Sequence, residues 1–578
     1  MSWVRKHGFY ARLAAQNMKK NGKYYLPYLL TCSGAAAMFY TMFFLSENQG
    51  INALQGSGYV LTMLWLGSGI IGIFSAIVLF YTNSFLMKQR KKELGLYNIL
   101  GMEKCHIARF LFWETAYTAF VGILGGLALG ILLSKLMLLI LCAILRAGVP
   151  FGFFVSGQGV WWTAVVFCAI FLLSLLTNLG RIGKSQPIEL LRGGNAGDRE
   201  PKTRWLAAVA GTVTLIAGYV IALMVKTPLA ALGLFFVAVL LVIIGTYCLF
   251  MAGSIAVLKL LRRNKAYYYQ TKHFTAVSGM LHRMKRNAAG LASVCILSTM
   301  VLVTVSTTVC LYLGMEEVLD MLYPRDVHLL MVESDQESMY AMVTAVEEEA
   351  DRLGIEISEL AWACYYPGEN DLGNTQFIGD KLKAYQDGLV LSAEGQAYPP
   401  TAYVGFNVAG GKAPAELREA LSGLLNSGAF RFQYGYVDER DKMAGETYAM
   451  LGGFFFIGLL LGFLFLMATA LIIYYKQVSE GYEDAEGFRI MQQVGMNEQE
   501  VRGSIHSQVM MVFFLPLFAA GVHIAFAFNM ITRLLTIFSL NNVGLFALCC
   551  LGTFLVFAAI YAAIYGWTAK AYYQIVKA

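Results

Sequence analysis

The sequence predicts an all-α polytopic membrane protein with ten transmembrane helices and one small α+β domain outside the membrane. Two observations lead to this fold class. Of the 578 residues, 57% are hydrophobic and only 14% are charged, whereas an ordinary soluble domain has about 25% charged residues. Apolar runs of about 20 residues, the length that crosses a bilayer as a helix, recur along the chain. The alternating polarity of membrane β-strands is not evident.

Ten apolar runs have the length and composition of membrane spans. A polar, basic N-terminal stretch precedes the first run and is too long for a cleavable signal peptide, so we expect this run to remain as a span. The predicted spans are Tyr24–Leu45, Tyr59–Tyr81, Phe110–Leu133, Val160–Leu179, Trp205–Val225, Leu229–Val257, Leu291–Leu313, Tyr448–Tyr474, Val509–Met530 and Gly544–Tyr565.

Charge separates a basic membrane part from an acidic insert. Residues 314–447 contain 24 Asp and Glu against 9 Lys and Arg, a net charge of −15, and the remainder of the chain carries +22. Lys and Arg gather in one set of inter-span segments, and the opposite short loops have few of them. Because basic loops stay in the cytoplasm, we expect both termini in the cytoplasm and residues 314–447 outside the cell.

The acidic insert has the pattern of a small α+β domain. A capping box at Ser334 opens a helix with an apolar face, and a second helix begins near Pro414 and ends before Gly428. Strand-like segments surround the two helices. They are Val327–Val332, Ile355–Tyr366, Ala402–Val408 and Ala429–Val437.

An internal repeat divides the membrane part into two halves. The segment Met18–Asn21 before the first span resembles Met284–Asn287 before the seventh, and Leu96–Met102 after the second span resembles Ile490–Met496 after the eighth. Each half is predicted to be a four-span module. The predicted units are residues 1–192 for the first module, 193–265 for joining spans five and six, 266–313 for the second pre-helix and span seven, 314–447 for the outside domain, and 448–578 for spans eight to ten.

The segment after span two, residues 88–109, has two interpretations. It is either a solvated charged loop or a short coupling helix that docks in a groove of a separate ATPase. The repeat of its apolar pattern and its Gly-Met ending after span eight favours the coupling helix. The predicted contact residues are Lys91, Lys92, Glu93, Leu96, Tyr97, Leu100, Gly101, Met102, Arg489, Met491, Val494, Gly495 and Met496.

Catalytic signatures do not emerge from the sequence. Residues 178–185 approach a phosphate-binding loop, but a membrane span precedes them and Pro187 follows, whereas that loop needs a strand before it and a helix after it. The seven histidines form no zinc signature, there is no nucleophile elbow, and span interiors have no carboxylate pair for a proton-coupled carrier. We therefore expect a non-catalytic chain without a cofactor or nucleic-acid partner, with ATP bound by a partner subunit.

The repeated motifs resemble those of the FtsX-like permease family. The resemblance lies in the basic pre-helix, in the stretch Lys91–Met102 and in the closing stretch Gln186–Arg192. The order of spans and the domain between spans seven and eight are most similar to the bacitracin-resistance (Bce-type) permeases. The second coupling motif departs from the first, with Arg489 in place of Gly95, and the outside domain is shorter than is usual for that group.

The resemblance implies several functional expectations. Such permeases lie in the bacterial plasma membrane, pair with two copies of an ATPase subunit and transmit motion instead of enclosing a channel. They protect bacteria from peptide antibiotics that target the cell wall, act on a peptide or a lipid-linked precursor in contact with membrane lipids, and commonly associate with a membrane sensor histidine kinase. The alternative within the same family is a mechanical transmitter that acts on lipids or lipoproteins, or that activates a cell-wall hydrolase.

Overall fold

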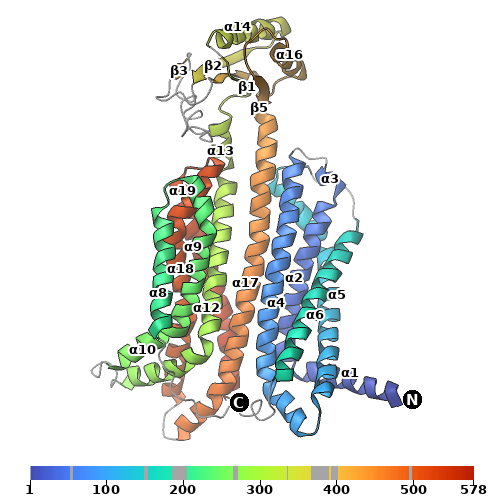
Figure 1. The fold of residues 1–578 in the computed structure, drawn as a ribbon, viewed down its shortest axis with the longest axis vertical. Helices are drawn as coiled ribbons and strands as arrows, with labels where there is room; N and C mark the ends of the chain where they lie inside the picture. Colours follow the sequence, from blue (N-terminus) through green and yellow to red (C-terminus); the bar gives the residue numbers. More distant parts are fainter. Residues whose placement is uncertain are drawn as a thin grey trace.

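The computed structural model describes residues 2–52, 56–148, 154–184, 205–263, 271–334, 336–365, 389–391, 401–493 and 498–577. It consists of a long helical bundle and a small α+β domain that stands at one end of the bundle (Figure 1). We call the opposite end of the bundle the distal end. Predicted unit boundaries at residues 192 and 265 fall outside the described residues.

Within the described residues, ten helices are long and apolar enough to cross a membrane. They coincide with the ten predicted spans, so this part of the prediction is confirmed. The bundle contains α1 (Ser2–Lys20), α2 (Gly22–Ser46), α3 (Gln49–Asn52), α4 (Ser57–Ile99), α5 (Lys104–Ile144), α6 (Gly157–Lys184), α8 (Trp205–Met224), α9 (Pro228–Cys248), α10 (Ser254–Arg263), α12 (Thr271–Leu313), α17 (Arg440–Gln493), α18 (Glu498–Leu535) and α19 (Val543–Lys577).

The first bundle, formed by α2, α4, α5 and α6, is held together by a close contact between α2 and α5. Glycines at a spacing of four residues line this face of α5. A Cβ added to Gly126 would lie 2.4 Å from Cβ of Ala36, and one added to Gly130 would lie 2.8 Å from the ring of Tyr40. Small residues at this spacing let two helix backbones approach closely, which is how helices associate where the hydrophobic effect is weak.

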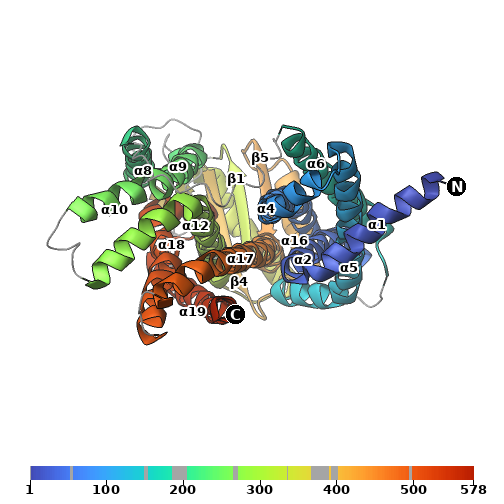
Figure 2. The ribbon, with the colours of Figure 1, turned by 90° about the horizontal axis from the view of Figure 1, so that it is seen from below.

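The second bundle contains α8, α9, α12, α18 and α19, and α17 lies between the two bundles (Figure 2). On one side α17 packs against α12 and α19, and on the other against α4, α2 and α5. Phe456, Leu464 and Phe465 of α17 belong to one continuous apolar core that also contains buried residues of both bundles. Most of the contact between the two bundles is therefore made through α17, although Tyr81 of α4 also hydrogen-bonds directly to Ser293 of α12.

The α+β domain is a five-stranded sheet with the order β3-β2-β4-β1-β5, and α14 (Gln336–Leu353) and α16 (Ala415–Asn426) pack on one of its faces. The strands are β1 (Val327–Val332), β2 (Ile357–Tyr365), β3 (Leu389–Leu391), β4 (Thr401–Val408) and β5 (Tyr434–Glu439). Neighbouring strands are antiparallel except for β2 and β3, which are parallel. The predicted α+β class of this domain is confirmed.

Two strand predictions in the domain were wrong in detail. The last strand begins at Tyr434, not at Ala429, because Phe430 and Phe432 pack against the core under α14 and α16 before the chain reaches the sheet. Strand β3 is absent from the prediction, since three residues carry too little periodicity to be recognised. The predicted apolar face of α14 is buried at Met339, Val343, Val346 and Ala350. On α16, for which Leu417, Leu421 and Leu424 were expected, Leu417 and Leu421 are buried, but Leu424 is only partly buried and Leu425 is buried instead.

A stalk connects the domain to the bundle. We define the stalk as α13 (Met315–Leu322) together with residues 440–450 of α17. The last residue of β5 is followed directly by α17, so sheet and helix share one chain without a loop. Arg440 fixes this junction: its side chain donates to the carbonyl of Tyr323 at 2.6 Å and to Asp320 at 2.5 Å, and its backbone N–H donates to Asp326 O at 2.9 Å.

His328 on β1 is a buried, neutral imidazole in the sheet. Nε2 lies 2.6 Å from the carbonyl oxygen of Arg325, and Nδ1 lies 2.6 Å from the hydroxyl of Tyr403. A carbonyl can only accept, so Nε2 carries the proton and Tyr403 donates to Nδ1. Burial lowers the pKa of His328 to about 4.

We expect acid pH to destabilise the α+β domain through His328. Its pKa is about 6.5 in an unfolded chain and about 4 in the fold. The stability that neutral His328 contributes is therefore complete above about pH 6.5 and is lost as the pH falls from there towards 4. Deuterium exchange at the imidazole C2 position, read by mass spectrometry, should give a midpoint near 4. A pH midpoint near 6.5 for the proteolytic peptide that contains His328 would contradict its assignment as a buried, neutral imidazole.

Candidate functional site

The predicted coupling segment is the distal end of α4 and the turn into α5, not a separate helix. Helix α4 continues through the span and ends only at Ile99, and α5 begins at Lys104. The prediction of a separate short helix over residues 88–109 was wrong, because the basic run in this segment does not interrupt helical hydrogen bonding. We call residues 96–102 the distal turn (Figure 1).

Gly101 and Met102 form the C-terminal cap of α4. The N–H of Gly101 donates to Asn98 O at 3.1 Å, and the N–H of Met102 donates to Tyr97 O at 3.0 Å. This pair of bonds defines a Schellman motif, which requires a left-handed residue after the helix, and Gly101 has a φ of +96°. The Gly-Met ending thus serves first to end the helix, before any role in docking.

The apolar residues of the distal turn divide into two groups. Tyr97 and Met102 pack inward against Phe110 and its neighbours at the start of α5. Leu96, Ile99 and Leu100 instead leave 50%, 57% and 72% of their surfaces exposed. The exposed group contains Ile99, which sequence reasoning missed, and excludes two residues that it proposed as anchors.

Not all predicted contact residues can be placed in this way. The backbones of Lys91, Lys92, Arg489 and Met491 lie in α4 and α17, but nothing is described of their side chains. Val494, Gly495 and Met496 lie outside the described residues. The predicted second coupling segment therefore stays a prediction.

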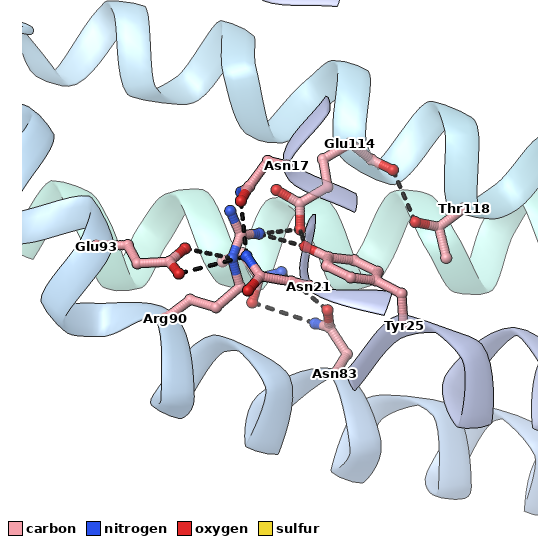
Figure 3. Close-up of polar contacts among 9 residues, drawn as sticks. Asn17, Asn21, Tyr25, Asn83, Arg90, Glu93, Glu114 and Thr118 are labelled. Atoms are coloured by element: carbon pink, nitrogen blue, oxygen red, sulfur yellow. Dashed lines mark hydrogen bonds and ion pairs between the residues drawn. The ribbon is translucent and has the colours of Figure 1, made fainter. Parts of the chain in front are cut away.

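A buried polar cluster lies beside the distal turn and joins four helices of the first bundle (Figure 3). Its centre is an ion pair between Arg90 of α4 and Glu114 of α5, whose side chains are 3% and 8% exposed. The hydroxyl of Tyr25 on α2 donates to Glu114 and accepts from Arg90. Burial is the largest single effect and lowers the pKa of Arg90, but the charges of Glu114, Tyr25 and Glu93 and the hydrogen bond to Glu114 together raise it above its usual value, so the guanidinium stays charged.

Amide side chains extend the cluster to α1 and α6. Asn21, at the α1–α2 junction, donates to Asn17 at 2.7 Å and to Glu93 at 3.3 Å (Figure 3). Glu93 also accepts from Arg90 Nε at 3.4 Å, so this predicted contact residue supports the cluster. On the other side, the amides of Asn83 and Asn178 pair at 3.2 Å and join α4 to α6.

Sequence reasoning missed the ion pair, although a signal was present. Glu114 is a single carboxylate near the start of an otherwise apolar predicted span, and such a group is costly unless it is paired. A basic run that includes Arg90 lies one helix earlier. The alignment that places Gly101 opposite Gly495 puts Asp484 and Gln508 opposite Arg90 and Glu114, so the sequence does not repeat this ion pair in the second half.

Three potential metal ligands lie at the start of α5. Ligand atoms of Glu103, Cys105 and His106 are within 4.8 Å of one another. The group is largely exposed, and the first turn of a helix carries partial positive charge, which opposes a cation. His106 is also engaged, since its Nδ1 lies 2.7 Å from the hydroxyl of Tyr10. We do not assign a metal to these residues.

Ten candidate spans among the described residues, an exposed apolar turn at one end and a domain carried on an unbroken helix at the other are the features of a multi-pass membrane protein. Residues 65–187, which cover α4 to α6, match the family described as FtsX-like permease C-terminal. This segment is therefore similar to FtsX-like permeases.

Comparison with known proteins narrows this class. The uncharacterized ABC transporter permease YvcS of Bacillus subtilis is 21% identical over 95% of this chain and 97% of its own length. The ABC transporter permease protein YxdM of the same organism is 22% identical over 90% of this chain and 93% of its own length. The bacitracin export permease protein BceB of Bacillus subtilis is 27% identical over 53% of this chain and 49% of its own. The chain is thus homologous to ABC transporter permeases, Bce-type permeases among them.

We expect that removing one partner of the Arg90–Glu114 ion pair destabilises the protein more than replacing both partners. Glu114→Ala leaves Arg90 buried without its counter-ion, which should cost about 3–5 kcal/mol, whereas Tyr25→Phe removes one hydroxyl bonded to charged groups and should cost about 1.5–3 kcal/mol. The double variant Arg90→Met with Glu114→Leu should recover most of the loss. Thermal unfolding of the purified protein in detergent measures this order, and equal effects of Glu114→Ala and Tyr25→Phe would contradict it.

Proposed function

We propose that this permease couples a cytoplasmic ATPase to its extracellular α+β domain, in defence against peptides that attack the cell wall. One observation carries the proposal. Helix α17 runs without a break from the end of β5 to the distal end of the bundle over 54 residues, a length of about 80 Å. A single helix of this kind can transmit displacement across a membrane without a transport channel.

The distal turn is the proposed docking site for the ATPase subunit. A groove that receives Leu96, Ile99 and Leu100 would bury three apolar side chains that are now exposed, and each fully buried side chain is worth about 1.5–3 kcal/mol. This is recognition of a helix end by an apolar groove. The second segment, residues 489–496, would dock a second ATPase copy.

The buried cluster makes the distal turn suitable for this role. Arg90, Glu114, Tyr25 and Asn21 bind the ends of α1, α2, α4 and α5 to one another, so a pull on the turn moves the first bundle as a body. Because α17 packs against α4 and α2, a shift of this bundle reaches α17 and α12. These two helices would then move the stalk and the domain.

The membrane orientation follows from charge. Both termini and the distal end, with its basic run before the distal turn, would be cytoplasmic under the positive-inside rule. The α+β domain would then lie outside the cell, where its net charge of −15 over residues 314–447 attracts cationic peptides at long range. The name of BceB, a bacitracin export permease protein, supports a peptide antibiotic or its lipid-linked target as the ligand, with a sensor kinase as a further partner.

We expect the distal turn to be required for ATPase binding. Changing Leu96, Ile99 and Leu100 together to Ser removes the apolar surface without adding charge. The ATPase subunit should co-purify with the native permease in mild detergent and be lost from this variant, with a matching loss of ATPase activity.

A matched control keeps this test specific. Val257 and Leu260 on α10 are 55% and 50% exposed apolar residues, and α10 also lies towards the distal end (Figure 1). Their change to Ser should leave the ATPase bound. If the ATPase subunit is lost equally from both variants, or is retained by both, the distal turn is not the docking site.

Deletion of the permease should raise sensitivity to those peptide antibiotics acting on the cell wall against which it protects. Growth inhibition across a panel of such peptides measures this, and the distal-turn variant should behave like the deletion. Unchanged sensitivity together with a stable extracellular protein partner would instead favour activation of a cell-wall hydrolase.

A further inference from the structure

We infer that Arg146 is a latch: it holds the stalk against the first bundle, and the stalk is released when this contact opens. Arg146 follows the C-terminal end of α5, at the end of the bundle near the domain. It is therefore at the opposite end of the first bundle from the distal turn. The inference concerns the permease alone and stands whether or not an ATPase docks at the distal turn.

Arg146 makes a closed set of polar contacts with both parts of the stalk. Its Nη1 donates to Glu316 Oε1 of α13 at 2.7 Å and lies 3.0 Å from the hydroxyl of Tyr448 on α17. Tyr448 in turn donates to the same Glu316 oxygen at 2.9 Å. The guanidinium also lies over the ring of Tyr448, 4.7 Å from its centre, a position in which a cation is attracted to the ring.

The backbone of Arg146 gives a second, independent observation. Helix α5 ends in the same Schellman geometry as α4: the N–H of Arg146 donates to Ala143 O at 3.3 Å, and that of Ala147 donates to Cys142 O at 2.9 Å. The residue at the left-handed position is Gly101 in α4 but Arg146 in α5, with a φ of +53°. A side chain is unfavourable there, so the preference for glycine is overridden, and the contacts of the side chain are the visible compensation.

The first bundle also packs closely against α17 at the level of Arg146. A Cβ added to Gly56, at the start of α4, would lie 2.7 Å from Cβ of Ala449 and 3.0 Å from Cα of Glu446. A Cβ added to Gly452 of α17 would lie 3.0 Å from the side chain of Leu145. Apolar contact thus positions the helices, and the ion pair of Arg146 adds α13 to the assembly.

The exposure of the ion pair makes it a contact that can open. The side chains of Arg146 and Glu316 are 52% and 56% exposed, and exposed pairs contribute little because water and salt compete for both charges. Hydrogen bonds from Arg146 and Tyr448 lower the pKa of Glu316, so the carboxylate stays charged in the closed state. The latch therefore restrains the stalk without locking it.

Arg146→Gly tests the latch because it separates two roles of the residue. Glycine suits the left-handed position, so the end of α5 should be as stable as before or more so. The contacts of the Arg146 side chain with Glu316 and Tyr448 disappear, while the hydrogen bond from Tyr448 to Glu316 within the stalk remains. Amide hydrogen exchange of the full-length permease should rise about two- to fivefold in α13 and residues 440–450. Exchange in α14 and α16, within the domain, should not change. The charge-swap variant Arg146→Glu with Glu316→Arg should restore slower exchange in the stalk.

Arg418→Ala is the matched control. Arg418 is about as exposed as Arg146, at 48%, and forms an ion pair at 3.3 Å with the more buried Glu439, but within the domain. Its loss should leave exchange in α13 unchanged. Any one of three outcomes would overturn the latch. Amide exchange in the stalk could stay unchanged in Arg146→Gly, it could rise equally in Arg418→Ala, or it could fail to slow again in the charge-swap variant. Loss of ATPase binding with a normal stalk response would affect only the proposed docking site.

Discussion

The hydrocarbon core of a bilayer contains no water, so every backbone N–H and C=O in it must be bonded within the protein. In α17 this requirement is met by continuous helical hydrogen bonding from the end of β5 to the distal end. The helix cannot bend locally without losing such bonds. The constraint that forms the spans therefore also makes α17 a stiff connection between the α+β domain and the distal end.

The two ends of the first bundle use ion pairs of opposite character. Near the distal turn, Arg90 and Glu114 are almost fully buried, where loss of one partner leaves an uncompensated charge. Near the domain, Arg146 and Glu316 are half exposed, where water can replace either partner at small cost. The buried pair keeps the bundle rigid as it moves, and the exposed pair permits the stalk to separate from it.

The C-terminal caps of α4 and α5 have the same backbone geometry but different functions. Both helices finish in a Schellman motif that favours glycine. Gly101 meets this preference, and the turn that follows presents an exposed apolar surface. Arg146 departs from it and directs its side chain to the stalk. A departure from a local rule thus marks a residue whose importance lies in a distant contact.

Sequence alone determined the ten spans, because a helix that crosses a bilayer needs about 20 consecutive apolar residues, and such a run is visible without any tertiary contact. The periodicity of apolar residues likewise determined the α+β class of the insert. The sequence also pointed to the distal turn. Only the tertiary structure decided which side chains of that turn are exposed, because Tyr97 and Met102 turn inward through contacts with α5. The pairing of Arg90 with Glu114, and of Arg146 with Glu316, was likewise undetermined, since 24 and 170 residues separate the partners and only helix packing brings them together.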